Sequence, residues 1–126
     1  MGGMQRRKGA VGEREVCQVL SDLGMLARRT AQYCGKTGDA ADIHVEGLGV
    51  HCEVKRTEKL RMYDAIEQAS RDSKRSHFIV LHRQSNKPWV VIQLLEHWVE
   101  DSMAAQGAIA HRQDIIDRAS GAIGDT

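Results

Sequence analysis

Three side chains that could act together on a phosphodiester lie in two short segments near the middle of the chain. Asp42 begins a run of alternating polar and apolar residues, and Glu53 and Lys55 stand two positions apart in a second such run. Carboxylate oxygens are the ligands that Mg²⁺ prefers, and the ion usually takes one or two of them besides water and substrate phosphate. It lowers the pKa of a bound water and stabilises charge on the phosphate, while a nearby lysine positions the nucleophile. These residue types therefore predict metal-dependent phosphodiester hydrolysis.

A β-hairpin must bring these side chains together. Residues 41–46 and 50–55 alternate in polarity and are joined by Gly47-Leu48-Gly49. Opposite residues of an antiparallel pair project to the same side, so a two-residue turn places Asp42 opposite either Glu53 or Lys55, whereas a three-residue turn separates the polar rows. We expect the shared-face register. Glu53 and Lys55 alone are better explained as a solvent-facing row of mixed charge.

A fourth carboxylate lies on a predicted N-terminal helix. Apolar residues at i, i+3, i+4 and i+7 from Val16 predict an amphipathic helix over residues 9–23, ended by Gly24. At about 100° per residue, Glu13 lies roughly 70° from the centre of the apolar stripe and Glu15 roughly 90°. Glu13 is therefore the better candidate for the site, although taken alone it is better explained as a helix N-terminal glutamate favoured by the macrodipole.

Three motifs occur in order along the chain: Lys8-Gly9-Ala10-Val11-Gly12-Glu13-Arg14-Glu15, Asp42-Ile43 and Glu53-Val54-Lys55. Together they resemble the archaeal-type Holliday junction resolvases of the PD-(D/E)XK nuclease superfamily, over residues 7–91. The resemblance implies that Glu13, Asp42 and Glu53 form an acidic metal site, that the Val54 carbonyl adds a ligand, and that Lys55 is the catalytic lysine. It also implies Mg²⁺, or alternatively Mn²⁺, and a homodimer with two active sites on a four-way DNA junction.

Three features depart from the family pattern. Ala41 stands where the superfamily label has proline, at a position that varies. Thr30 and Thr37 are the candidates for the functional serine that family members often carry in the loop before the strand aspartate. Residues from about 94 onward have no counterpart, so the resemblance says nothing of their role.

The remaining pattern predicts the elements around the hairpin. It indicates strands at 25–31, 77–82 and 89–94 and helices at 62–73, 94–106 and 111–119, with frayed residues at 121–126. We therefore predict an α/β protein with a restriction-endonuclease-like mixed five-stranded sheet flanked by helices. The apolar runs at 77–82 and 89–94 predict burial on both faces.

The same pattern predicts the organisation of the chain. Residues 1–93 are expected to form a nuclease core with a basic N-terminal arm, and residues 94–126 a C-terminal helical extension of the same domain. Trp98, Val99 and Met103 are expected in the core, with a dimer contact as the alternative.

Charge is distributed unevenly along the chain. The overall net charge is +1, but residues 1–38 hold seven basic and three acidic residues, while residues 93–126 hold two and six. The front half could therefore face a polyanion, although a solvated basic arm is the alternative. The expected phosphate contacts are Arg6, Arg7, Lys8, Arg29, Lys36 and Arg56.

Composition excludes several classes of protein. Five aromatic residues argue against base stacking on aromatic platforms, and no apolar run is long enough to span a membrane or to serve as a signal peptide. We expect a cytoplasmic protein without a membrane partner. Three cysteines without C-x-x-C spacing are expected to be reduced thiols.

Two metal or phosphate motifs are rejected. Gly35-Lys36-Thr37 lacks the earlier glycine and the following helix of a P-loop. A zinc site of His44, His51 and Cys52 is disfavoured because alternation points Cys52 away from His51.

The leading hypothesis is a metal-dependent, structure-selective DNA endonuclease that resolves or nicks branched DNA, with four-way junctions as the expected partner. One alternative keeps the fold and changes the substrate, as in a nicking or flap nuclease of a phage or other mobile element. A non-catalytic DNA-binding protein on the same scaffold, or a plain structural domain, are the further alternatives.

Overall fold

A computed structural model describes residues 2–30, 41–74 and 76–124 of the chain. The chain forms two compact units. The first unit, Met1–Gln93, contains α1 (Gly2–Asp22), β1 (Ala27–Arg29), β2 (Ile43–Val45), β3 (His51–Arg56), α3 (Met62–Asp72), β4 (Phe78–Arg83) and β5 (Val90–Ile92). The second unit, Leu94–Thr126, contains α4 (Leu95–Gly124).

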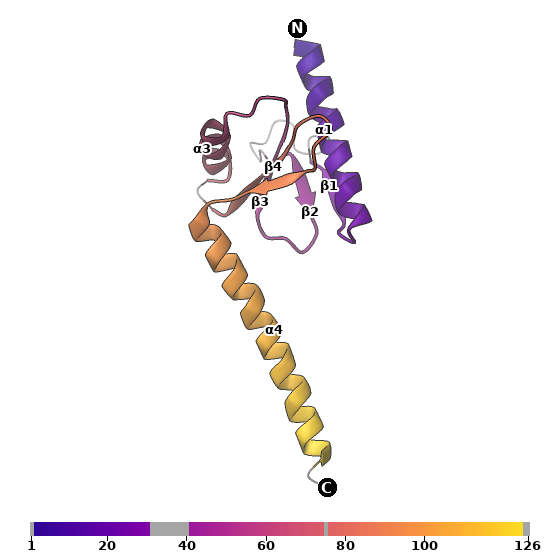
Figure 1. The fold of residues 1–126 in the computed structure, drawn as a ribbon, viewed down its shortest axis with the longest axis vertical. Coiled ribbons are helices and arrows are strands. Elements are labelled where there is room, and N and C mark those ends of the chain that lie inside the picture. The colour runs from indigo at the N-terminus through magenta and orange to yellow at the C-terminus, as the bar shows by residue number, and fades with distance from the viewer. Residues whose placement is uncertain (1, 31–40, 75, 125–126) are drawn as a thin grey trace. The chain divides into compact units, whose positions relative to one another are not determined.

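The five strands form one mixed sheet in the order β1-β2-β3-β4-β5 (Figure 1). Three neighbouring pairs are antiparallel, while β3 and β4 are parallel and are connected through α3. A crossover helix is the usual way to join parallel neighbours. The predicted α/β architecture, a mixed five-stranded sheet flanked by helices, is confirmed.

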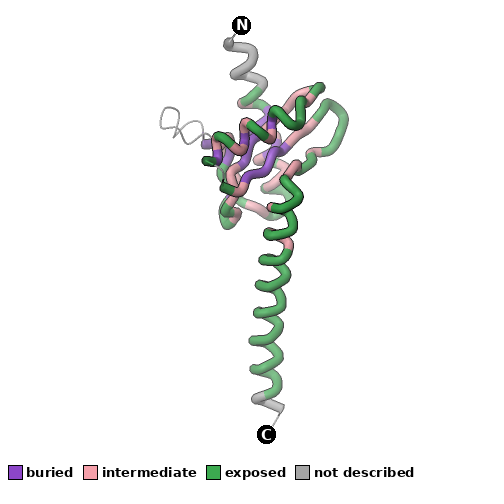
Figure 2. The backbone as a smooth tube through the Cα atoms, turned by 90° about the vertical axis from the view of Figure 1, so that its left-hand side faces the viewer, coloured by how far each residue is buried: buried purple, intermediate pink, exposed green. Residues whose placement is uncertain are grey.

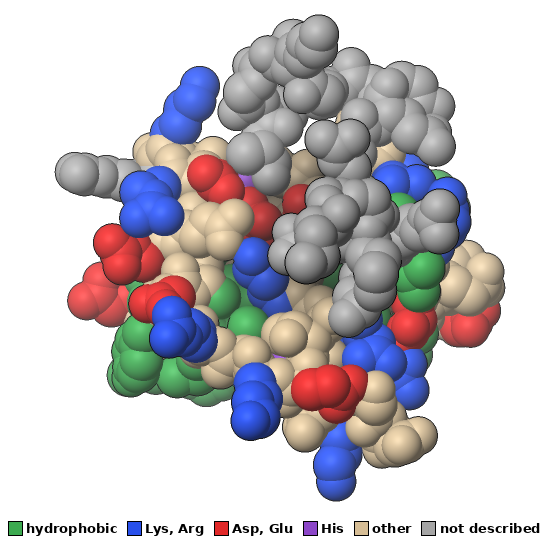
Figure 3. Space-filling view, turned by 90° about the horizontal axis from the view of Figure 1, so that it is seen from above, with side chains coloured by type: hydrophobic (Ala, Val, Ile, Leu, Met, Phe, Trp, Pro, Cys, Tyr) green, Lys and Arg blue, Asp and Glu red, His purple; other side chains and the backbone are tan. Residues whose placement is uncertain are grey.

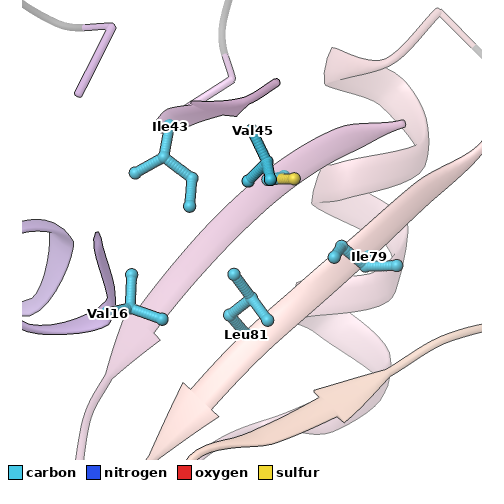
Figure 4. Packing of buried hydrophobic residues seen from close by; sticks show 6 residues of the cluster. Val16, Ile43, Val45, Ile79 and Leu81 are labelled. Carbon is cyan, nitrogen blue, oxygen red and sulfur yellow. The ribbon is translucent and has the colours of Figure 1, made fainter. Parts of the chain in front are cut away.

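The sheet is covered by α1 on one face and by α3 on the other (Figure 1). Successive residues of β4 point to opposite faces, so this central strand contributes to both cores. On the α1 face the buried cluster is Val16, Ile43, Val45, Cys52, Ile79 and Leu81, most of which Figure 4 labels. On the α3 face it is Ala65, Ala69, Phe78 and Val80.

The β2–β3 hairpin adopts the shared-face register. Ile43 pairs with Cys52, and the Asp42 N–H donates to the Cys52 carbonyl at 2.9 Å. Continuing the pairing by one residue brings Asp42 opposite Glu53. Residues 46–50 close the hairpin, and Gly47 supplies the positive φ of +79° that the turn requires.

Helix α1 ends where the sequence predicts and starts earlier. Gly24 has a φ of +94°, and the Met25 N–H reaches back to the Leu20 carbonyl at 2.9 Å, which is a glycine-terminated helix end. The helix begins at Gly2 rather than at residue 9. The residues expected to form a basic arm are therefore helical in backbone, in keeping with the good helix propensity of Gln, Arg and Lys.

Gly12 allows α1 to lie close against β3. A Cβ atom built on Gly12 would stand 2.6 Å from Cβ of Arg56 and 3.7 Å from a Val54 methyl. The same atom on Gly9, one turn earlier, would meet nothing within 4 Å. A side chain at position 12 would therefore push the helix away from the strand that carries the candidate site.

The expected burial of β5 on both faces is wrong. Val90 is 45% exposed and Val91 is 59% exposed. β5 is exposed because it is the last strand of the sheet, whereas the helices cover the centre of the sheet. Of the two apolar runs at 77–82 and 89–94, only the first, which forms β4, is buried on both faces.

The two helices predicted after residue 94 are one helix, α4, which continues through Gly107 to Gly124. Alanines at 104, 105, 108 and 110 favour the helix on both sides of Gly107 and offset its cost. The expected fraying from residue 121 is also wrong as far as Gly124. Trp98, Val99 and Met103 are not core residues, because α4 is exposed along most of its length (Figure 2).

Candidate functional site

Two carboxyl groups meet at the start of the β2–β3 hairpin, that of Glu53, which is buried, and that of Asp42, which is half-buried. Asp42 Oδ2 accepts a hydrogen bond from the Val54 backbone N–H at 2.7 Å, and the carboxyl groups of Asp42 and Glu53 hydrogen-bond to each other. Burial, and next the negative charge of Glu53, raise the pKa of Asp42 to about 7. Without a cation, this carboxyl pair therefore holds a proton close to neutral pH.

Lys55 lies on the same side of β3 and is held by the helix that follows. Its Nζ donates to Oε1 of Gln68 on α3 at 2.8 Å, and its positive charge lowers the pKa of Asp42 against the larger effect of burial. Gln68 therefore fixes the ammonium group beside the carboxyl pair.

Glu13 approaches the pair from α1. It is only 9% exposed, and its Oε2 accepts a hydrogen bond from Arg29 Nε at 3.0 Å. Burial raises the pKa of Glu13, and the nearby charge of Asp42 raises it further against the opposing effect of Arg29. Glu15, the other candidate on this helix, pairs instead with Arg83 and Arg56.

Sequence reasoning missed a second group that shares Glu53. His51 Nε2 lies 2.6 Å from Glu53 Oε1, and Asp72 offers a carboxylate oxygen such that all three ligand atoms lie within 4.8 Å of one another. Burial favours a neutral imidazole, but the hydrogen bond and charge of Glu53 outweigh it and raise the pKa of His51. Alternation already placed His51 beside Glu53, whereas no local pattern indicates Asp72, the last residue of α3.

Two overlapping sets of side chains could therefore hold a metal ion. Asp42 and Glu53, with Glu13 nearby, offer only hard oxygen ligands, which suit Mg²⁺ or Mn²⁺. His51, Glu53 and Asp72 add an imidazole nitrogen, which suits transition metals. The raised pKa of Asp42 reflects negative charge that desolvation and the neighbouring Glu53 leave uncompensated, and a divalent cation fits that place.

A hollow of about 390 Å³ lies next to this group. It is lined by residues that include Thr30, His44, His51, Asp72 and Lys74. The Thr30 hydroxyl donates to the Ala41 carbonyl, and the Thr30 N–H donates to the Asp42 carbonyl at 3.2 Å. Thr30 therefore fixes the entry of the chain into β2, while Thr37, the other candidate for the loop hydroxyl, lies outside the described residues.

The expected phosphate contacts fall in several places. Arg29 is bound to Glu13, and Arg56 lies 3.6 Å from Glu15 and 3.5 Å from Glu58. The first turns of α1 contain Arg6, Arg7 and Lys8, whose side chains are not among those that the structure describes. Lys36 lies outside the described residues. Lys and Arg side chains alternate with Asp and Glu around the face seen in Figure 3.

The disfavoured zinc site is not assembled. Cys52 is 1% exposed within the cluster under α1, on the side of β3 opposite His51. Cys17 and Cys52, the two described cysteines, are free thiols. Within the described residues, no helix is apolar and long enough to cross a membrane.

Comparison with known proteins gives one structural similarity. The chain resembles the structure of Hjc from Archaeoglobus fulgidus, a Holliday junction resolvase from an archaeal hyperthermophile, with a TM-score of 0.45 and 17% sequence identity. The similarity covers 65% of this chain and 72% of that chain. No family model matches the sequence, and no curated protein matches it.

Proposed function

We propose that this protein is a metal-dependent endonuclease that cleaves branched DNA, with four-way junctions as its principal substrate. One observation carries the proposal. The half-buried Asp42 and the buried Glu53 form a carboxyl pair, and Lys55 is fixed next to it by a 2.8 Å hydrogen bond to Gln68. Two carboxylates and an ammonium group on one sheet face supply the side chains that phosphodiester hydrolysis needs.

The carboxyl groups would hold the ion. Asp42 and Glu53 would bind Mg²⁺, or Mn²⁺ in its place, with help from Glu13 and the Val54 carbonyl. When bound, the metal lowers the pKa of water and stabilises negative charge on the phosphate. The Val54 N–H fixes the orientation of Asp42, and His51 fixes that of Glu53.

The positive charges of Lys55 and Arg29 would have different roles. Lys55 is tethered through the neutral amide of Gln68, and its ammonium group would act on the attacking water or on the phosphate oxygens. Arg29 is already committed to Glu13 at 3.0 Å, which holds that carboxylate in place at the edge of the site. Arg29 would therefore act on DNA chiefly by compensating charge.

DNA binding would depend on the backbone phosphates. Arg6, Arg7, Lys8, Lys36 and Arg56 are the proposed contacts, and binding through them should weaken steeply with salt. The scarcity of aromatic residues favours recognition of DNA shape over bases. Two copies of the chain would present one site to each of two strands at a junction.

Cleavage of a synthetic four-way junction tests the proposal. End-labelled junctions, flaps and linear duplexes are incubated with protein and Mg²⁺ at one salt concentration. We expect symmetric nicks in the junction, abolished in Glu53→Gln and Lys55→Ala with junction binding retained. Glu46→Gln and Lys87→Ala are matched controls, since both residues are exposed and remote from the carboxyl pair.

Each outcome separates the alternatives. Preferred cleavage of flaps or single nicks in duplex would favour the flap or nicking nuclease. Junction binding by the wild-type protein without metal-dependent cleavage would favour the non-catalytic binding protein. Undiminished Mg²⁺-dependent cleavage by both Glu53→Gln and Lys55→Ala would refute the assignment of the site.

A further inference from the structure

The helix α4 exposes more apolar surface than a single helix in water can stably carry. Its large apolar side chains are between 40% and 73% exposed over five turns and more (Figure 2), namely Leu95, Trp98, Val99, Met103, Ile109, Ile115 and Ile116. Most helical stability in proteins comes from packing of an apolar face rather than from propensity. Some partner is therefore expected along this helix.

Four of these side chains, Leu95, Trp98, Ile109 and Ile116, fall on two positions of a seven-residue repeat. One position of the repeat holds Leu95, Ser102, Ile109 and Ile116, and a second holds Trp98, Ala105, Arg112 and Ala119. Spacings of three and four residues are those of the seam along which two helices pack in a coiled coil. We call these eight residues the α4 seam.

We propose that a second copy of this chain packs antiparallel along the α4 seam, with the symmetry axis beside Gly107. In that arrangement the two seam positions face each other between copies. The pairs are then Leu95 with Ala119, Trp98 with Ile116, Ser102 with Arg112 and Ala105 with Ile109. Each layer sets a larger side chain against a smaller one, which is how packed layers fill space evenly.

The charged member of the seam decides the direction of the pairing. A parallel pair in register would place Arg112 directly against Arg112 of the other copy, and like charges in a seam repel. The antiparallel pair places Arg112 against Ser102 and next to Asp101 of the second copy. A guanidinium group beside a carboxylate is favourable, so the sequence of the seam selects the antiparallel pair.

The size of the surface suits a dimer. At roughly 200 Å² for a large apolar side chain, the exposed fractions of the residues in and beside the seam give on the order of 700 Å² per helix. A standard interface buries about 800 Å² on each partner. A second copy of α4 along the full length of the seam therefore approaches the size of a standard interface.

A pair of neighbouring substitutions tests the proposal. Ala104 and Ala105 are both exposed on α4, but only Ala105 belongs to the seam, whereas Ala104 lies on the far side of the helix. The change Ala105→Glu places a carboxylate in the seam, and Ala104→Glu makes the same change outside it. Sedimentation equilibrium of the full chain should show dimers for the wild type and Ala104→Glu, and at least a tenfold weaker dimer for Ala105→Glu.

Oxidative cross-linking tests the direction. A Leu95→Cys chain mixed with an Ala119→Cys chain should form a disulfide-linked heterodimer, with the wild-type chain under the same oxidation as background. Disulfides only between like chains would overturn the antiparallel pairing. A monomeric wild type at 100 μM, or equal dimerisation of Ala104→Glu and Ala105→Glu, would overturn the interface itself. The inference rests on α4 and not on the nuclease proposal, so either can fail alone.

Discussion

Replacing Asp42 by asparagine should stabilise the metal-free protein at alkaline pH. The asparagine Oδ1 can accept the 2.7 Å hydrogen bond from the Val54 N–H, and its Nδ2 can donate to Glu53. Asp42→Asn thus copies the neutral form of the carboxyl group without its proton. The substitution removes a half-buried negative charge that repels Glu53, and it keeps both polar contacts.

The magnitude follows from the pKa of Asp42. Its pKa is about 7 in the folded protein against an ordinary value of 3.8. A carboxyl group with a raised pKa binds its proton more tightly in the folded state, so the free energy of unfolding falls as pH rises from about 4 to about 7. Some three units at 1.36 kcal/mol each give an upper limit of about 4 kcal/mol. The gain from Asp42→Asn should reach this limit above pH 7 and vanish near pH 4.

Urea denaturation in chelator at pH 4.5, 6 and 8 measures this dependence. Asp64→Asn is the matched control, because Asp64 is a well-exposed aspartate on α3 and the change should shift stability by less than about 0.5 kcal/mol at each pH. A loss of stability in Asp42→Asn at pH 8, or an equal change at all three pH values, would refute the reasoning.

Added Mg²⁺ should reverse the order of the two proteins. At a metal concentration 100 times the dissociation constant, binding stabilises a folded protein by about 2.7 kcal/mol. The wild type should gain this stability at pH 8, whereas Asp42→Asn, which lacks one of the proposed ligands, should gain little. Equal stabilisation of both proteins by Mg²⁺ would remove Asp42 from the metal site.

Three further predictions concern Gly12, Gln68 and His51. Gly12→Ala should destabilise the protein by about 1–3 kcal/mol, since its Cβ would clash with β3, whereas Gly9→Ala should stabilise α1 by up to about 1 kcal/mol; thermal denaturation measures both. Gln68→Ala frees the Lys55 ammonium group and, on the proposed function, should lower single-turnover cleavage of junction DNA while sparing junction binding. His51→Ala should raise the Mg²⁺ concentration for half-maximal cleavage roughly 10–100-fold, and His51→Gln, which still donates to Glu53, should raise it less.

Clear results would contradict each of these. A stable Gly12→Ala protein would mean that α1 does not lie close on β3. Unchanged cleavage by Gln68→Ala would mean that its hydrogen bond to Lys55 does not position the lysine. An identical Mg²⁺ requirement in His51→Ala and the wild type would leave His51 without a role in orienting Glu53.

The hairpin half of the candidate site was predictable from local pattern. Strict alternation determined which residues of 50–55 share a face, and a two-residue turn in either of two registers placed Asp42 beside them. The Ile43–Cys52 pairing realises one of these registers. Glu13 is buried and Glu15 is not, as expected from the smaller angle between Glu13 and the centre of the apolar stripe of the helix.

The contacts supplied by α3 were not predictable in the same way. Gln68 and Asp72 reach the site because the crossover from β3 to β4 lays α3 over that face of the sheet. This packing depends on residues 13 or more positions apart, which no periodicity reports. The continuity of α4 was missed for another reason, since Gly107 read locally as a break while the alanines around it outweigh a single glycine.

The two outer strands of the sheet have a consequence for how copies of the chain can meet. β1 and β5 are each only three residues long, and Pro88 comes just before β5. An edge this short offers very few unpaired amide and carbonyl groups to a strand from another molecule. Fibre-like growth by strand addition is thereby discouraged at both ends of the sheet, which leaves assembly of this protein to its helices.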